Sequence, residues 1–278
     1  MNSKEIYWSI IMPAYNVEKY IANAIDSVMA QTIPSEFYEI IIIDDSSSDN
    51  TKTIIKEYQK KYDNIKLIES SSGPRWQSIC WQEGIEEAKG FWLGFLDADD
   101  YLYPNALEEM TKYYIRSNSP NRENHIICAW SQNERRDSDL KRIISKGLSE
   151  DPYKWGSLID GMLRNPGVIV SHFLTCMREA LLKIGGFDTS IKTSADRWLA
   201  LKMDLHGKLG FYNKVLCQYR FLRPGSVTVD RRDEQIEYLS KVLNSALEER
   251  FDNRRVELIK KEDNFSYNIN VISEFKDL

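Results

Sequence analysis

The sequence predicts an α/β fold, in which a mostly parallel sheet has helices on both of its faces. Short apolar runs alternate with stretches of helical spacing over the first hundred residues, and this alternation is typical of β-α-β units. The fourth apolar run, residues 91–96, ends directly in Asp97, Asp99 and Asp100. Because ligands of such sheets bind outside the carboxyl ends of the strands, the fold class also predicts where a site would lie.

The first half of the chain supplies four strands and three helices. The strands are short apolar runs that end in polar or turn-forming residues, at residues 8–12, 38–43, 65–68 and 91–96. The helices have apolar residues at helical spacing, at residues 17–31, 51–61 and 77–89. We expect Pro13 to stop the first strand and Gly90 to close the third helix. Asn16 and Asp49 are the expected N-caps of the first two helices.

The second half of the chain is less regular. Residues 117–149 are polar and charged, so we expect an exposed excursion with one short strand at residues 126–130. The later elements are a turn, a helix, a strand and an amphipathic helix, at residues 185–188, 196–206, 212–219 and about 230–261. We expect the amphipathic helix to pack on the domain or on a partner rather than to lie on a membrane.

Composition and charge exclude several classes of protein. The 278 residues carry a formal net charge of −5, whereas a nucleic-acid-binding protein needs a basic face. The four cysteines lie far apart without a Cys-x-x-Cys pair, so reduced thiols are expected. No apolar run approaches the about 18 residues of a membrane span, and residues 1–7 do not resemble a signal peptide. We therefore expect a cytoplasmic protein, which is compatible with a place at the inner face of the membrane.

The acidic residues after the fourth strand have two interpretations. Three carboxylates within four residues repel one another, and a divalent cation would relieve that repulsion. Oxygen ligands without a neighbouring His or Cys favour Mg²⁺ or Mn²⁺, with water and substrate phosphates completing the coordination. The alternative is a solvated acidic turn ahead of a helix that begins near Pro104.

Polar groups follow three of the four predicted strands. In chain order they are Pro13-Ala14-Tyr15, Asp44-Asp45 and residues 97–100. Because parallel strands end at the same edge of a sheet, we expect these groups to converge on one site. Taken alone, Tyr15 is equally well an ordinary half-buried aromatic residue, and Asp45 is equally well a turn cap.

The sequence resembles glycosyltransferase family 2, the inverting, nucleotide-sugar-dependent enzymes of the GT-A fold. The motifs that carry the resemblance occur in the family's order and at similar spacing: SIIMPAYN (9–16), IDDSSSD (43–49), AKG (88–90), LDADD (96–100), GGFD (185–188), SADRW (194–198), YR (219–220) and PGS (224–226). Each motif is weak by itself, whereas the set is specific and spans residues 8–228. The resemblance implies a Rossmann-like GT-A domain over residues 1–228, with a nucleotide-binding half (1–116) and an acceptor-binding half (117–228). A helical extension would follow at residues 229–278.

The resemblance implies a donor site at the strand ends. The nucleotide-binding residues that it implies are Pro13, Ala14, Tyr15, Asp44, Asp45, Gln77 and Asp97. The Tyr15 ring can stack on a base and the Asp45 carboxylate can accept an imide N–H, as uracil offers, so UDP is the expected nucleotide. Gln77 matches a glutamine found in another branch of the family.

The same resemblance implies a metal beside the donor. Asp97 would reach the ribose or the metal, and Asp99, with Asp100 as a second ligand, would hold Mn²⁺ or Mg²⁺. Such an ion would bridge the diphosphate and neutralise the leaving group, at the point where charge develops in the reaction.

An inverting transfer also needs a base that deprotonates the acceptor hydroxyl from the opposite side of the sugar. The family places this base in a Glu-Asp pair that opens a helix, and Asp196 matches the Asp. The alternative is a structural Asp that is favoured by the helix dipole. His172 and Trp198 are expected on the acceptor side, although a lone His is more often structural.

Two departures from the family pattern affect these expectations. Ala195 stands where the family usually has Glu, so the acceptor contacts are expected to differ while the base is kept. Leu222 stands where the family often has a His that helps to bind diphosphate or metal. This leaves Arg220 or Arg223 as the cation that binds the diphosphate.

The expected function is transfer of a sugar from a UDP-sugar to a saccharide or lipid-linked saccharide, in surface polysaccharide or lipopolysaccharide synthesis; this rests on the family alone. One alternative is a non-catalytic relative that binds sugar nucleotides. Another is a sugar-1-phosphate nucleotidyltransferase, which would carry a Gly-rich loop where this chain has residues 13–16. Peripheral membrane association and a homodimer through the C-terminal helix are compatible with the sequence.

Overall fold

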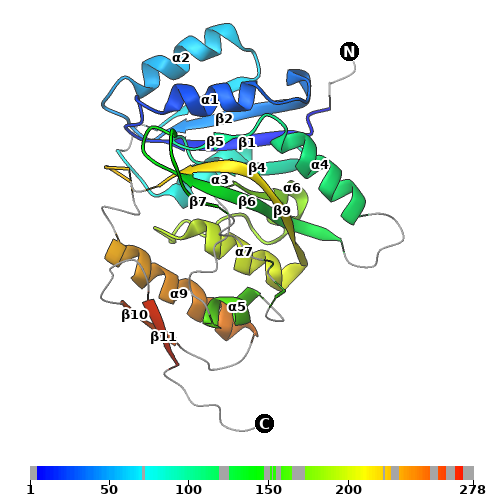
Figure 1. The fold of residues 1–278 in the computed structure, drawn as a ribbon, viewed down its shortest axis with the longest axis vertical. Helices are drawn as coiled ribbons and strands as arrows, with labels where there is room; N and C mark the ends of the chain where they lie inside the picture. The colour runs from blue at the N-terminus through cyan, green and yellow to red at the C-terminus, as the bar shows by residue number, and fades with distance from the viewer. Residues whose placement is uncertain are drawn as a thin grey trace.

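The computed structural model describes residues 5–70, 73–118, 125–146, 151, 153–154, 158–164, 173–221, 223–226, 232–250, 256–260 and 267–271. Its centre is one large sheet with the strand order β3-β2-β1-β4-β8-β6-β9-β5, and β7 pairs with β6 beside this path. Figure 1 shows α1 and α2 at one end of the molecule and α7 and α9 at the other.

The first half of the sheet is parallel. Its strands are β1 (Trp8–Ala14), β2 (Tyr38–Asp44), β3 (Ile65–Glu69) and β4 (Trp92–Leu96), and its helices are α1 (Ile21–Met29), α2 (Thr51–Lys61) and α3 (Gln77–Glu87). β1 lies between β2 and β4, β3 is the outer neighbour of β2, and all three pairs are parallel. The predicted alternation of strands and helices is therefore confirmed, because each helix carries the chain back to start the next parallel strand.

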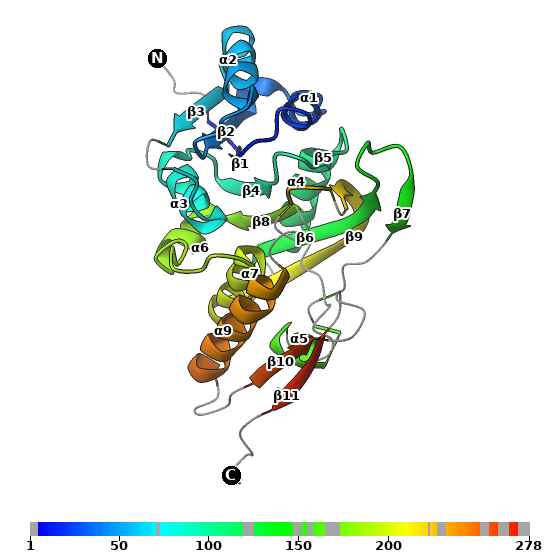
Figure 2. The same cartoon turned by 90° about the vertical axis from the view of Figure 1, so that its left-hand side faces the viewer.

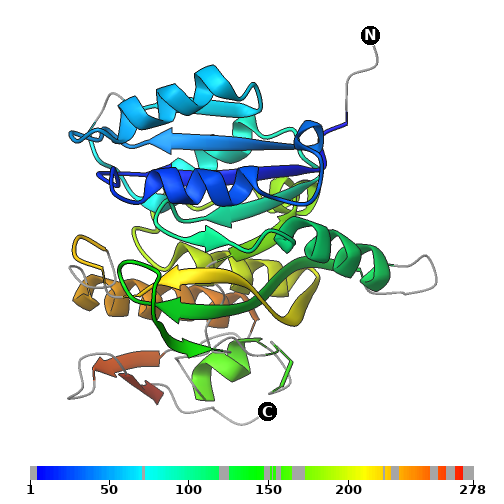
Figure 3. The same cartoon turned by 45° about the horizontal axis from the view of Figure 1, so that its top comes forward.

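The second half of the sheet is mixed. Its elements are β5 (Tyr101–Leu102), α4 (Ala106–Ser117), β6 (Ile126–Arg136), β7 (Ile143–Lys146), α5 (Leu158–Arg164), β8 (Phe173–Met177), α6 (Arg178–Lys183), α7 (Ala195–His206) and β9 (Lys208–Arg220). β8 runs antiparallel to both β4 and β6, whereas β6 and β9 are parallel and lie side by side in Figure 3. This arrangement brings the end of β9 next to the ends of the first strands, because β9 also pairs with β5 directly after the acidic residues.

Alternate residues of the central strands face two separate cores. Ile11 and Ile41 point to the core that contains residues of α3, α7 and α9. Ile10 and Ile40 point to the core that contains residues of α1, α2 and α4. Gly84 of α3 lets that helix approach the sheet, because a Cβ at this position would collide with the side chain of Ile11. The sheet is therefore covered on both faces, as the apolar strands predicted.

The start of the chain differs from the expected boundaries. β1 runs through Pro13 to Ala14, and Pro13 is the register partner of Ile43, so the proline does not stop the strand. α1 begins at Ile21 rather than near residue 17, and Asn16 is not its cap. Asn16 instead adopts a left-handed backbone conformation with a φ of 50° and accepts a hydrogen bond from a serine of the next loop.

The expected exposed excursion at residues 117–149 is wrong for its first part. β6 extends to Arg136 and is an interior strand whose polar residues, from Ser131 to Glu134, are buried. The Glu134 carboxylate accepts hydrogen bonds from the Tyr103 hydroxyl and the Arg136 guanidinium, and Lys146 lies 3.2 Å from it. These partners allow a polar sequence to lie in the sheet, and a reading of polarity alone could not predict them.

The C-terminal part is only partly helical. α9 (Arg232–Arg250) ends earlier than expected and is followed by the antiparallel pair β10 (Val256–Lys260) and β11 (Tyr267–Val271). The apolar residues that predicted the amphipathic helix are all buried: Ile236, Leu239, Val242, Leu243, Ala246 and Leu247. They pack in the core that also contains α7, and Figure 2 shows α9 lying alongside α7. Among the described residues, no helix combines the length and apolar character needed to cross a membrane.

Candidate active site

The residues at the strand ends converge as the parallel order predicts. Ala14 and Asp44 are register partners, and the N–H of Asp45 donates to the carbonyl oxygen of Ala14 over 2.8 Å. Pro13 is half-buried, whereas Tyr15, directly after β1, is 46% exposed. The Tyr15 ring is therefore accessible to a flat ligand at this edge of the sheet.

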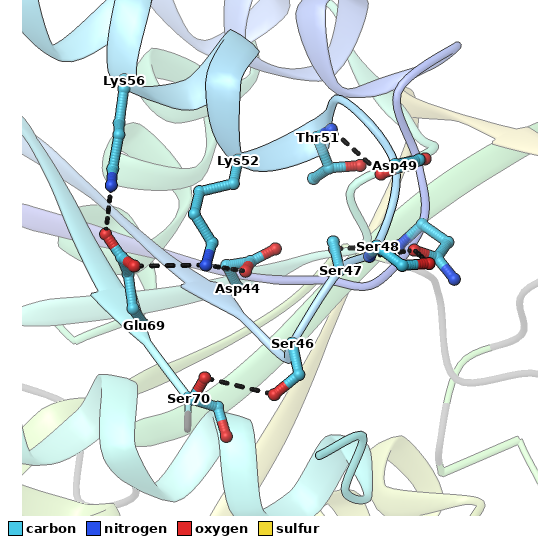
Figure 4. A network of polar contacts seen from close by, with 11 residues as sticks. Asp44, Ser46, Ser47, Ser48, Asp49, Thr51, Lys52, Lys56, Glu69 and Ser70 are labelled. Atoms are coloured by element: carbon cyan, nitrogen blue, oxygen red, sulfur yellow. Dashed lines mark hydrogen bonds and ion pairs between the residues drawn. The ribbon is translucent and has the colours of Figure 1, made fainter. Parts of the chain in front are cut away.

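The loops after β1 and β2 are held together by hydrogen bonds. The N–H of Asn16 donates to the Ser47 hydroxyl over 3.0 Å, and the N–H of Ser48 donates to the Asn16 side-chain oxygen over 2.8 Å. The N-cap of α2 is Asn50 rather than the expected Asp49, although the Asp49 carboxylate accepts a hydrogen bond from the N–H of Thr51 at the start of the helix (Figure 4). These contacts fix the segment that carries the exposed aromatic residue after β1.

Asp44 is buried beside Lys52 of α2. Its side chain is 0% exposed, and the nearest cation is Lys52 of α2, whose Nζ lies 3.8 Å from Oδ2. Lys52 also lies 3.3 Å from Glu69, so Asp44 belongs to an ion-pair network beneath α2 (Figure 4). Successive strand residues point to opposite faces, so Asp44 and Asp45 diverge. Asp44 is thus buried next to Lys52, and its expected role as a nucleotide ligand stays a prediction.

Asp45 is held by an arginine that sequence reasoning missed. Arg75 donates to Asp45 through its backbone N–H, and its Nε lies 2.9 Å from the second carboxylate oxygen. The remaining guanidinium nitrogens bind Glu83, with Nη2 at 2.9 Å from Oε2. The Glu83 hydrogen bonds and the Asp45 carboxylate raise the pKa of Arg75. The one sequence signal for Arg75 is its place between β3 and α3, beside the strand edge.

Gln77 and Asp97 are brought together from separate elements. Gln77 is the first residue of α3, and its side-chain amide donates to Asp97 Oδ1 over 2.6 Å. Asp97 itself follows the last residue of β4. The contact places the start of α3 against the acidic residues, as the expected shared role of these two residues requires.

Asp99 and Asp100 are buried carboxylates that lie close to each other. Burial, together with the neighbouring charge of Asp97, raises the pKa of Asp99, against the opposing effect of Arg223. Burial and the charges of Asp99 and Asp97 raise the pKa of Asp100 well above its usual range. The solvated acidic turn that was the alternative interpretation does not describe these two side chains.

Two arginines at the end of β9 balance this charge. The backbone N–H of Arg220 donates to Asp100 Oδ1 over 3.0 Å, and its Nε donates to the carbonyl oxygen of Asp99 over 2.8 Å. The Nε of Arg223 donates to Asp99 Oδ2. Burial lowers the pKa of Arg220, whereas for Arg223 the Asp99 carboxylate outweighs burial and raises the pKa. Leu222, between them, lies outside the described residues.

The donor atoms at this place fit a divalent cation only in part. Asp99 and Asp100 offer hard carboxylate oxygens, and their mutual repulsion would be relieved by an ion. Within the described part of the chain, no three or more His, Cys, Asp or Glu side chains are grouped so that they could hold a metal by themselves. An Mg²⁺ or Mn²⁺ would therefore need oxygens from a bound ligand to complete its coordination.

Asp196 lies in a different setting. It stands in the first turn of α7 and is half-buried, and its carboxylate makes no hydrogen bond or ion pair with any other described residue. The preceding cap, Ser194, has a left-handed conformation with a φ of 61°, which is uncommon for a residue other than glycine. The Ser78 hydroxyl of α3 donates to the carbonyl oxygen of Ile191 over 2.5 Å, which ties this loop to the donor side.

Of the two residues expected on the acceptor side, Trp198 is within the described part of the chain and His172 is not. Trp198 is 6% exposed and packs against Phe187, with ring centroids 5.4 Å apart. It is therefore a core residue, because the fourth position of α7 faces inward. His172 lies outside the described residues.

Comparison with known proteins agrees with this arrangement. The family model Glycosyl transferase family 2 matches residues 9–183. The chondroitin synthase of Escherichia coli is 28% identical over 239 residues, which are 86% of this chain and 32% of that protein. The minor teichoic acid biosynthesis protein GgaB of Bacillus subtilis is 34% identical over 231 residues, 81% of this chain and 24% of that protein. The chain thus spans about a third or less of the length of these relatives.

Solved structures share the fold. Staphylococcus aureus TarS 1–349 in complex with UDP-GlcNAc is similar with a TM-score of 0.69 at 18% identity, covering 87% of this chain and 67% of that one. The Pyrobaculum calidifontis mannosyltransferase PcManGT in complex with GDP-Man and Mn²⁺ has a TM-score of 0.64 at 18% identity, covering 86% and 64%. The matched family model, the order of the sheet and the convergence of the strand ends agree: the chain belongs to glycosyl transferase family 2 and has the GT-A fold.

Proposed function

We propose that this chain transfers a sugar from a nucleotide-diphosphate sugar, a UDP-sugar in particular, to an acceptor hydroxyl with inversion at the anomeric carbon. The observation that carries the proposal is the convergence, at one sheet edge, of an exposed aromatic ring, a carboxylate held by an arginine and an acidic cluster. Tyr15, Asp45 and Asp99 represent these three parts. The names of relatives, a chondroitin synthase and a teichoic acid biosynthesis protein, support an acceptor in surface polysaccharide synthesis.

The nucleotide would lie across the ends of β1 and β2. Tyr15 would stack on the base, with Pro13 and Ala14 forming the floor beneath it. The Asp45 carboxylate, oriented by Arg75, would accept the imide N–H of uracil, since a carboxylate has lone pairs left after two hydrogen bonds. A UDP-GlcNAc complex of a protein with the same fold supports this choice of donor.

The diphosphate would lie over the acidic cluster. Asp99 and Asp100 would hold Mn²⁺ or Mg²⁺ together with the phosphate oxygens, and Asp97 would reach the ribose or the ion. The ion, when bound, neutralises charge that develops on the departing diphosphate. Arg220 and Arg223 would add positive charge from the end of β9.

Asp196 would act as the general base. Its half-buried carboxylate has no partner among the described residues that would compete for a proton. It would take the proton of the acceptor hydroxyl while the acceptor oxygen forms its bond to the anomeric carbon. The bond from that carbon to the phosphate oxygen breaks, and the nucleoside diphosphate leaves with the electron pair. Attack opposite to the leaving group inverts the configuration.

The residues on the two sides of this reaction define two parts of the domain. We propose that residues 1–116 bind the donor and residues 117–228 form the acceptor side, with α9 packed beneath α7 as a support. Arg220 and Arg223 would be the exception to this division. They belong to the second part of the chain but would bind the donor, because β9 pairs with β5 next to the acidic residues.

A panel of nucleotide sugars tests the proposal. The protein would be incubated with UDP-, GDP- and dTDP-sugars, Mn²⁺ and a mixture of oligosaccharide acceptors, and both nucleotide release and the anomeric configuration of the product would be measured. Release of UDP that depends on acceptor, with an inverted product, is the expected result. Binding of a UDP-sugar without any release under all conditions would instead support a non-catalytic sugar-nucleotide-binding protein.

A further inference from the structure

One aromatic ring lies against both arginines of the acidic cluster. Tyr20, the half-buried residue just before α1, has the guanidinium carbon of Arg220 4.5 Å from its ring centroid. The guanidinium carbon of Arg223 lies 5.2 Å from the same centroid. Both distances are within the range, about 6 Å, at which the face of an aromatic ring attracts a cation.

Two of the three guanidinium nitrogens of Arg220 donate hydrogen bonds to the protein, and the third has no partner among the described residues. Its Nε donates to the carbonyl oxygen of Asp99, and its Nη1 donates to the carbonyl oxygen of Ser138. Arg220 is only 2% exposed, so its Nη2 is buried from water, and this nitrogen has no hydrogen-bond partner in the described structure. A buried guanidinium N–H without an acceptor is costly, so this nitrogen is suited to an anionic ligand.

The second arginine is held less completely. Arg223 Nε donates to Asp99 Oδ2, and its Nη1 lies 3.2 Å from the carbonyl oxygen of Pro224. Two guanidinium groups near one carboxylate repel each other, and the electron-rich face of Tyr20 offsets that repulsion. The ring therefore helps to hold the two guanidinium groups next to each other beside Asp99 and Asp100.

We propose that Tyr20 is a positioning residue, whose ring holds Arg220 and Arg223 in the geometry that receives a diphosphate. This inference rests on the proposed function, because the donor supplies the diphosphate. Phosphate oxygens accept hydrogen bonds from guanidinium groups in pairs, so the orientation of the two planes decides how well they bind. Tyr20 acts through the arginines and is not itself placed on the donor.

The ring can be separated from the hydroxyl by substitution. Tyr20→Leu removes the ring face and should weaken UDP binding by about 3- to 30-fold in calorimetry with Mn²⁺, the range expected for a lost cation–π contact. Uridine, which has no phosphate, should bind Tyr20→Leu as it binds the unchanged protein. Tyr20→Phe keeps the ring and should restore UDP affinity. Tyr62→Leu is the matched control, since Tyr62 has a cation–π contact with Lys61 away from the site.

A protein that lacks both arginines distinguishes a positioning role of Tyr20 from a merely structural one. In a protein that carries Arg220→Met and Arg223→Met, the further change Tyr20→Leu should have no additional effect on UDP affinity. The proposal would be overturned if Tyr20→Leu weakened UDP and uridine binding equally. It would also be overturned if Tyr20→Leu weakened UDP binding as much in the Arg220→Met, Arg223→Met protein as in the unchanged protein. Melting temperatures would accompany each measurement, and Tyr20→Met replaces Tyr20→Leu if the latter does not fold.

Inorganic pyrophosphate separates this inference from the proposed function. If the unchanged protein binds pyrophosphate in a manner that depends on Tyr20 but binds no nucleotide, the positioning role stands and the nucleotide-sugar proposal fails. If it binds neither pyrophosphate nor UDP, both are overturned.

Discussion

The carboxylates of the donor side and the carboxylate of Asp196 lie in contrasting environments. On the proposed donor side, Asp45 is bound by Arg75, Asp97 by Gln77, and Asp99 by Arg223. Asp196 stands in the first turn of α7 without such a partner among the described residues. The carboxylates that would bind a highly charged donor thus each have a protein partner, whereas Asp196 has none in the described part of the chain.

This contrast separates two physical requirements. Carboxylates that meet a metal and a diphosphate must stay together while the site is empty, and buried like charges need counter-charges for that. A general base must be able to change its protonation state during the reaction, and a strong ion pair would hold it in the ionised form. The prediction is that substitutions on the donor side alter ligand affinity, while a substitution at Asp196 alters turnover.

The largest effect is expected at Asp196. Asp196→Asn should slow sugar transfer by roughly 10²- to 10⁴-fold, because it removes general-base catalysis. Donor affinity should stay nearly unchanged, since the base acts on the acceptor hydroxyl in the transition state. Turnover, UDP affinity and melting temperature would be measured on one preparation. A fully folded Asp196→Asn protein with near-normal turnover would show that Asp196 is a structural helix-start residue.

The next effect is expected at Asp99. Asp99→Asn should remove most of the strengthening of UDP binding by Mn²⁺, a loss on the order of 10²-fold or more, since even outer-shell partners of metals change affinity by 10- to 100-fold. Calorimetry of UDP binding with Mn²⁺ and with EDTA measures it. Asp63→Asn, a change of the same charge in an exposed turn, is the control. Equal UDP affinity with Mn²⁺ and with EDTA in the unchanged protein would contradict the metal assignment.

The sequence could predict that the ends of the parallel strands meet at one site. It could not predict the side-chain contacts that join this site to residues distant in the sequence. The order of strands places Ala14 opposite Asp44 and brings residue 45 to the ligand edge, because the chain pattern alone determines which ends are neighbours. The Asp44 carboxylate lies 3.8 Å from Lys52 of α2, and no motif indicates that pairing. The contact of Tyr20 with Arg220 joins residues that are distant in sequence, and only the folded sheet brings them together.

The second half of the chain shows why its polar residues led to a wrong prediction of an exposed segment. Gln132 and Glu134 read as exposed residues, yet they lie in an interior strand because Asn213, Tyr103 and Arg136 provide their hydrogen-bond partners. Trp198 illustrates the reverse error, since its motif indicated the acceptor side but the inward face of α7 placed it in the core. Sequence patterns identify which residues are unusual, whereas partners from other strands decide where they lie.

A smaller effect is expected at Asp45. Asp45→Ala should weaken UDP binding by on the order of 1.5–3 kcal/mol, the value of one charge-assisted hydrogen bond. Pyrophosphate binding should not change, because Asp45 is proposed to bind the base rather than the phosphates. Competition binding of UDP and pyrophosphate to both proteins measures the difference. An equal weakening of both ligands would show that Asp45 acts on the loop structure or the metal rather than on the base.

The smallest effect is expected at Arg75. Its substitution tests whether the contact between Arg75 and Asp45 helps or hinders donor binding. Arg75 holds the Asp45 carboxylate through its Nε, and Glu83 in turn holds the guanidinium. Because the Asp45 oxygens keep free lone pairs, the arginine orients the carboxylate without blocking it. Arg75→Met should therefore weaken UDP binding only about 2- to 10-fold, as expected for one lost orienting hydrogen bond, and Glu83→Gln should weaken it less. Calorimetry with UDP on the three proteins gives the order of affinities. If Arg75→Met binds UDP more tightly than the unchanged protein, Arg75 competes with the base for Asp45, and the counter-charges of the donor side must be displaced before the donor can bind.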